Sequence, residues 1–84
     1  MKVMGIFTVY VVRTCAGTLY VGQTNNLAKR LLMHKQGKGA KYLRRFDSFE
    51  LVYSEIYKTR SEAMKREAQL KKMKKGQKER LVNI

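Results

Sequence analysis

One glutamate within an apolar helical face is the residue of this 84-residue chain whose position most strongly suggests chemistry. When residues 61–74 are placed at about 100° per residue, Glu67 lies in the middle of an apolar arc, whereas Glu62 lies well outside it. The arc consists of Ala63, Met64, Ala68 and Leu70. A carboxylate on the core side of a helix is costly unless it is paired or binds a cation. Two interpretations follow: an ion pair with Lys71 at i+4, or coordination of a hard cation such as Mg²⁺, which prefers oxygen ligands and keeps several waters.

Arg30 and His34 are four residues apart, so they share one face of a predicted helix at the edge of its apolar stripe. The planar guanidinium of Arg30 is suited to a bidentate contact with a phosphate. The imidazole of His34, with an ordinary pKa of about 6.5, is suited to proton transfer. Each residue also has a structural interpretation: Arg30 as the solvated flank of a helix, and His34 as a partly buried boundary residue.

Tyr10 and Tyr20 are expected on the two strands of a hairpin. A turn at residues 14–17 would place them opposite each other or one residue out of register. Cross-strand or core packing is the ordinary role of such tyrosines. Gly22 is more specific, because a glycine that closes a strand often marks a bulge or a close approach of the backbone to another group.

A basic loop is predicted at residues 37–48, and its residues 37–45 combine flexible glycines with four cations and an aromatic ring. These residue types suit contacts with backbone phosphates, with the tyrosine available for base stacking. The residues predicted to bind nucleic acid are Lys38, Lys41, Tyr42, Arg44, Arg45 and, from the later helix, Lys71. The alternative interpretation is a solvated basic loop.

Charge narrows the class of partner. Nineteen Lys and Arg against six Asp and Glu give a formal net charge of +13, which points to a polyanion and first of all to nucleic acid. A membrane surface is less suited, because no basic amphipathic stretch stands apart from the core helices. Cys15 is the only cysteine, so no internal disulfide forms, which fits a reducing cytosol. There is no signal-peptide pattern and no apolar run of about 18 residues, so we expect a cytoplasmic protein. We also expect a monomer.

The predicted elements describe one domain, residues 1–84. Strands are predicted at residues 6–12, 18–22 and 49–57. The predicted helices are one capped by Thr24 or Asn25 and ending near Gly37, one from Ser61 to about Lys75, and a short one at residues 77–82 after a break at Gly76. This order indicates an α+β domain, a small three-stranded sheet covered by helices.

The order and spacing of these residues together resemble the GIY-YIG nuclease domain, from about residue 7 to residue 81. Thr8-Val9-Tyr10 stands for the first triplet of that name and Tyr20-Val21-Gly22 for the second. The first helix, with Arg30 and His34, is similar to that of the family. Residues 37–42 and 62–71 look like those of its small stand-alone bacterial members, the UPF0213-like group.

The resemblance implies a three-stranded antiparallel sheet flanked by helices and a metal-dependent endonuclease that hydrolyses phosphodiester bonds. The implied substrate is DNA, with RNA left open, and the implied pathways are repair and recombination. Tyr10 would be the general base or orient the water, and Tyr20 would position the nucleophile or phosphate. Arg30 would stabilise charge on the scissile phosphate, and His34 would assist proton transfer near Tyr10. Glu67 would hold one divalent metal, Mg²⁺ or Mn²⁺.

One departure from the family pattern bears on catalysis. Gln23 stands where many active members place a lysine or another residue near the site. A second function therefore stays open, a nucleic-acid-binding module with weak or no catalysis. A third, a basic protein-interaction module, predicts no salt-sensitive binding of DNA.

Overall fold

The structure, a computed structural model, describes residues 6–38, 41–44, 46 and 48–83. Its three strands form one antiparallel sheet in the order β2-β1-β3. The strands are β1 (Phe7–Thr14), β2 (Leu19–Thr24) and β3 (Phe49–Tyr57), and the helices are α1 (Leu27–Lys35), α2 (Lys41–Arg44), α3 (Arg60–Lys72) and α4 (Lys75–Val82). The predicted α+β class with a three-stranded antiparallel sheet flanked by helices is confirmed.

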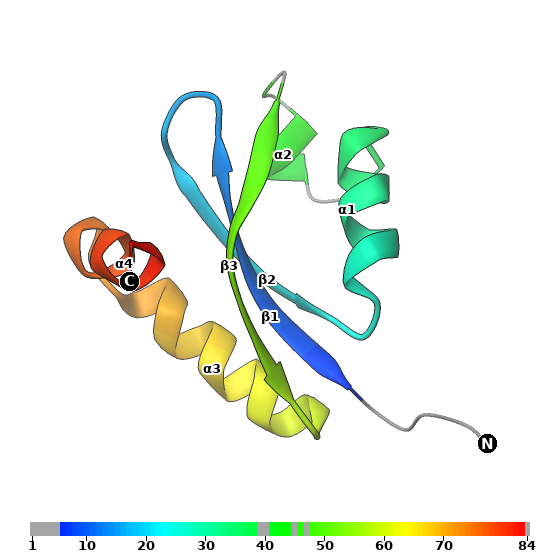
Figure 1. Ribbon diagram of the computed structural model, residues 1–84, viewed down its shortest axis with the longest axis vertical. Coiled ribbons are helices and arrows are strands. Elements are labelled where there is room, and N and C mark those ends of the chain that lie inside the picture. The colour runs from blue at the N-terminus through cyan, green and yellow to red at the C-terminus, as the bar shows by residue number, and fades with distance from the viewer. Residues whose placement is uncertain (1–5, 39–40, 45, 47, 84) are drawn as a thin grey trace.

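Helices cover both faces of the sheet, with α1 and α2 on one side and α3 and α4 on the other (Figure 1). The central strand β1 supplies buried side chains to both layers, because successive residues of a strand point to opposite faces. Val9 and Val11 pack with Ala63 and Leu70 of α3. The side toward α1 and α2 has a core of its own, formed by Tyr10, Val12 and Leu43 with the half-buried Tyr20, Leu27, Leu31 and Phe49 around it.

The hairpin register differs from both predicted alternatives. Tyr10 lies opposite Gly22, and Tyr20 lies opposite Val12. The two tyrosines are thus two residues out of register, neither opposite nor one apart, and a shift of two keeps them on the same face of the sheet. The turn that sets this register has Gly17 at φ +86° and is tied by a Thr14–Thr18 hydroxyl contact of 2.7 Å.

Two helix starts were assigned to the wrong residues. Asn26 caps α1, since its side chain accepts a hydrogen bond from the Lys29 amide at 3.1 Å. Thr24 instead accepts from the Asn26 amide and holds the turn before the helix. Thr59, not Ser61, caps α3.

The expected break at Gly76 is also wrong. α3 ends at Lys72, and an extended Met73 separates it from α4. Gly76 lies inside α4, whose start is stabilised by a hydrogen bond from the Lys74 amide to the Gln77 side chain at 3.1 Å. The segment expected to be all loop contains α2. No helix among the described residues has the length and apolar content needed to cross a membrane.

Candidate active site

A buried hydrogen bond between β1 and α1 forms the centre of the site. The hydroxyl of Tyr10 lies 3.0 Å from Nε2 of His34, and the two residues are 1% and 3% exposed. Tyr10 belongs to the central strand and His34 to the last turn of α1, so both are held by packed elements rather than by loops. The expected placement of His34 near Tyr10 is what the structure has.

Gly22 makes room for the ring of Tyr10 on the neighbouring strand. A Cβ built at position 22 would lie 2.5 Å from the Tyr10 hydroxyl oxygen and 2.6 Å from Cζ, distances that no side chain tolerates. The close approach predicted from this glycine is confirmed. A glycine opposite Tyr10 lets the phenol lie flat across β2 and reach His34.

Tyr20 completes an aromatic wall around the imidazole. Its ring centroid lies 6.2 Å from that of His34, and Phe49 packs edge-on to the same imidazole at 5.9 Å. On the outer side, Tyr42 of α2 stacks on Tyr20 at 5.8 Å with an interplanar angle of 15°. One face of Tyr42, the residue expected to stack on bases, is therefore already covered by Tyr20.

Burial and charge set the protonation of the central pair. Burial, the neighbouring Tyr20 and the charge of Glu67 raise the pKa of Tyr10 to about 12, against the lowering effect of Arg30. Burial and the positive charge of Arg30 lower the pKa of His34. At pH 7 the imidazole is therefore neutral, and a neutral imidazole with its proton on Nδ1 accepts the phenolic proton at Nε2.

Glu67 lies at the border of this site and is engaged by a lysine. Its carboxylate is 22% exposed and forms an ion pair with Lys71 at 3.0 Å. The ion-pair interpretation from sequence thus describes a real contact. The negative charge of the same carboxylate raises the pKa of Tyr10, so Glu67 acts electrostatically on the phenol.

The described residues among those predicted to contact nucleic acid lie in two places: Lys71 belongs to α3, and the others lie in α2 or shortly before it. Lys38 follows α1, and Arg44 lies in α2; both are exposed. The stacking of Tyr42 on Tyr20 sets α2 beside the aromatic wall. The side chain of Lys41 and all of Arg45 lie outside the described residues.

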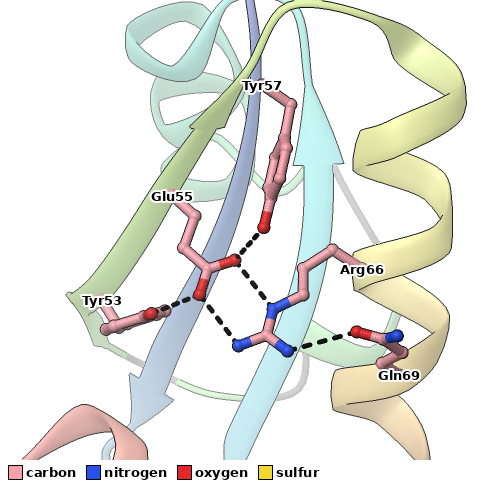
Figure 2. Close-up of polar contacts among 5 residues, drawn as sticks. All are labelled: Tyr53, Glu55, Tyr57, Arg66 and Gln69. Carbon is pink, nitrogen blue, oxygen red and sulfur yellow. Dashed lines mark hydrogen bonds and ion pairs between the residues drawn. The ribbon is translucent and has the colours of Figure 1, made fainter.

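A polar network on the opposite face of the sheet had not been predicted (Figure 2). Arg66 of α3 forms two hydrogen bonds with the carboxylate of Glu55 on β3, at 2.9 and 3.0 Å. Tyr53 and Tyr57 also donate to that carboxylate, the latter at 2.7 Å, and Arg66 contacts Gln69 at 3.2 Å. This network connects α3 to the sheet through Arg66, the residue that precedes Glu67 in the sequence. The available signal was two tyrosines at i−2 and i+2 of a strand glutamate, which share its face.

Glu55 should make folding stability depend on acid. Burial raises its pKa, but the hydrogen bonds from Arg66, Tyr53 and Tyr57 outweigh it and lower the pKa from 4.5 to about 2. A carboxyl with a depressed pKa stabilises the fold above its unfolded pKa, and the contribution disappears as pH falls from about 4.5 to about 2.

Glu55→Gln should therefore lower stability at pH 7 by about 2 kcal/mol, because one charge of a half-buried pair is left without its partner. For a domain of this size that is a drop in Tm of roughly 8–16 °C. Thermal melts from pH 7 to pH 2 check this, with Glu50→Gln on the exposed part of β3 as control. A Glu55→Gln protein that melts like wild type at pH 7 would contradict the assignment.

Comparison with known proteins defines the class. Residues 6–80 match the family described as the GIY-YIG catalytic domain. The chain belongs to this family of nuclease domains.

Among proteins of the family, the chain is similar to bacterial UPF0213 proteins. One from Oceanobacillus iheyensis is 43% identical over 76 residues, which are 90% of this chain and 88% of that protein. One from Bacillus pumilus is 48% identical over 62 residues, which are 74% of this chain and 63%, less than two thirds, of that protein. The solution NMR structure of the UPF0213 protein BH0048 from Bacillus halodurans is 35% identical, with a TM-score of 0.62 over 93% of this chain and 83% of that one.

Proposed function

We propose that this domain is a divalent-metal-dependent endonuclease that hydrolyses phosphodiester bonds in DNA. The observation that carries the proposal is the buried Tyr10–His34 hydrogen bond, with the charges of Arg30 and Glu67 acting on the same phenol. Strongly perturbed groups gathered in this way are typical of active sites.

In the proposed reaction, Arg30 binds the scissile phosphate and stabilises the charge that develops on it. Tyr10 orients the attacking water and takes its proton, while His34 accepts the proton of the phenol at Nε2. Tyr20, on the same face of the sheet, positions the phosphate or the water. A neutral phenol is a weak base at pH 7, so Arg30 is important because its charge favours the ionised form.

Glu67 is the residue that would hold the metal. Among the described residues, no three His, Cys, Asp or Glu side chains come together as a metal site. Glu67 therefore fits a site with one protein carboxylate, in which water and the substrate phosphate provide the other ligands, as Mg²⁺ commonly accepts. Bound there, Mg²⁺ or Mn²⁺ would polarise the phosphate and neutralise the leaving oxygen. Lys71 would give up its ion pair and become available to the DNA backbone.

We propose that the basic and aromatic residues singled out in the sequence bind the DNA on either side of the cut. These residues are Lys38, Lys41, Tyr42, Arg44, Arg45 and Lys71. We extend the proposal to structured DNA intermediates of repair or recombination, in a cytoplasmic monomer.

A nucleic-acid-binding module without catalysis is the second candidate. It is favoured by two observations: the pKa of Tyr10 is raised to about 12, and the Glu67 carboxylate is already paired with Lys71. A protonated base and an occupied metal ligand describe an inactive site. The two candidates differ in cleavage and agree in binding.

One experiment separates the candidates and tests the partner. Flaps, junctions, hairpins, duplexes and single strands, as DNA and as RNA, are incubated with Mn²⁺ or with EDTA. We expect cleavage of DNA in Mn²⁺ only, and its absence from every substrate would leave the binding module. Binding is measured in EDTA, where six phosphate contacts give a slope of log affinity against log salt of about −5. A slope near zero would remove nucleic acid as the main partner.

A further inference from the structure

A small polar cavity opens at the end of the sheet where β1 begins and β2 ends. Its volume is about 150 Å³. It is lined by Phe7, Gln23, Thr24, Asn25, Arg30 and Arg60. Arg30 comes from α1 and Arg60 from the beginning of α3. The cavity therefore has lining residues from helices on both sides of the sheet.

Two arginines line the cavity, and none of its lining residues is an Asp or a Glu. Arg30 and Arg60 take part in none of the ion pairs found among the described residues, which use Arg13, Arg66 and Lys71. The same three pairs engage Glu79, Glu55 and Glu67, three of the six acidic residues of the chain. Two cations on one cavity repel each other unless an anion lies between them. A planar guanidinium pair is suited to an oxyanion such as phosphate.

We propose that this cavity binds a backbone phosphate of the nucleic acid, the one that flanks the scissile phosphate. The inference rests on the proposed function, because Arg30 belongs to both the cavity and the active site. Arg60 supplies the second charge and the amide groups of Gln23 and Asn25 supply neutral hydrogen-bond donors. A strand whose scissile phosphate contacts Arg30 from the Tyr10 side would present its next phosphate to Arg60.

The subsite gives Gln23 a purpose. A lysine at position 23 would add a third positive charge to a cavity that two arginines already line. The glutamine keeps a donor in place without that repulsion.

The test uses the whole domain and DNA trinucleotides with two phosphates, in EDTA so that no cleavage occurs. Either phosphate is replaced in turn by a neutral methylphosphonate, and inorganic phosphate is titrated separately. Binding is followed by NMR through the Nε–H signals of Arg30 and Arg60. Arg60→Gln removes the proposed contact, and Arg80→Gln, an exposed arginine of α4 outside the cavity, is the matched control.

We expect inorganic phosphate to shift both arginine signals, and Arg60→Gln to bind the fully charged trinucleotide about tenfold more weakly. Replacing one of the two phosphates by a methylphosphonate should weaken binding about tenfold in wild type and in Arg80→Gln. The same replacement should not weaken binding to Arg60→Gln any further, because two changes that remove the two partners of one contact do not have additive effects. Equal losses in all three proteins at both linkages, or no shift of Arg60 with phosphate, would overturn the subsite. If the coupling is seen but Mn²⁺ gives no cleavage in any substrate, hydrolysis fails and the subsite stands as a DNA contact.

Discussion

Glu67→Gln is expected to reduce Mn²⁺-dependent cleavage by at least about 10³-fold, because a bound metal supplies several kcal/mol of charge stabilisation in the transition state. Glutamine keeps the shape of the side chain and loses the charge that a divalent cation needs. The fold should survive, since the Glu67–Lys71 pair is partly exposed and such pairs contribute about 1 kcal/mol or less. DNA affinity in EDTA should be unchanged or slightly higher, because Lys71 is released.

The matched control is Glu62→Gln in the same helix. Glu62 is exposed, and its carboxylate accepts a hydrogen bond from the hydroxyl of the capping Thr59 at 3.1 Å. Glu62→Gln removes one negative charge from α3, as Glu67→Gln does, but leaves the candidate active site unchanged. Single-turnover cleavage, a thermal melt and a binding curve are recorded for both variants. Full cleavage by Glu67→Gln would show that this carboxylate is not the metal ligand, and a large loss of stability would show that the ion pair with Lys71 is its main role.

The position of Glu67 shows how well the spacing of apolar residues in a helix predicts burial. The projection placed it in the middle of an apolar arc, yet only Ala63 and Leu70 of α3 are buried, and Met64 is 50% exposed. A thin domain gives each helix a narrow buried stripe, so residues at the flanks of a predicted arc end up at its border. The sequence therefore predicts which side of the helix carries the carboxylate and not how deeply it lies.

Strands were predicted more closely than turns and caps. The bounds of β3 were predicted correctly, because a run of apolar and aromatic residues with apolar side chains on both faces is typical of a strand. The register of Tyr10 and Tyr20 depends on a turn with Gly17 at positive φ, and several turn geometries fit the same residues. At Gly76 the low helix propensity of glycine is outweighed by the Gln77 cap and the packing of Met73 into the core.

The hydrogen bond between Tyr10 and His34 shows that spacing in the sequence does not predict contacts between distant elements. Spacing within a helix predicts that Arg30 and His34 share a face, but the residues that meet them come from a strand some twenty positions earlier. The family resemblance supplied that long-range pairing, and Gly22 supplied an independent hint because it makes room for the phenol. Arg60 gave no signal in the sequence, since its neighbours in space come from β1, β2 and α1.

Tyr10→Phe is expected to slow the chemical step by roughly 10²- to 10⁴-fold, the usual contribution of general acid–base catalysis. The ring is retained, so it still packs across Gly22 and inside the aromatic wall. One hydrogen bond to His34 is lost, which costs about 1 kcal/mol of stability or somewhat more for a buried partner. DNA affinity should stay the same, because the cations that provide it are unchanged.

The dependence of the rate on pH adds a second readout. Burial raises the pKa of Tyr10 to about 12. Below that pH, the ionised fraction of the phenol rises tenfold with each unit by which the pH increases. The wild-type single-turnover rate should therefore rise with pH over the range in which the protein stays folded. In Tyr10→Phe this rise should be lost along with the rate.

Tyr57→Phe provides the control for the loss of a phenolic hydroxyl. Its hydroxyl donates to Glu55 at 2.7 Å on the opposite face of the sheet, so its removal affects stability and not the site. Measured well below the melting temperature, Tyr57→Phe should cleave at the wild-type rate and Tyr10→Phe should not. If Tyr10→Phe matches the wild-type rate and its dependence on pH, the phenol is a packing residue and the base lies elsewhere. If both variants lose cleavage in proportion to their loss of stability, Tyr10 serves the fold, and it is not the general base.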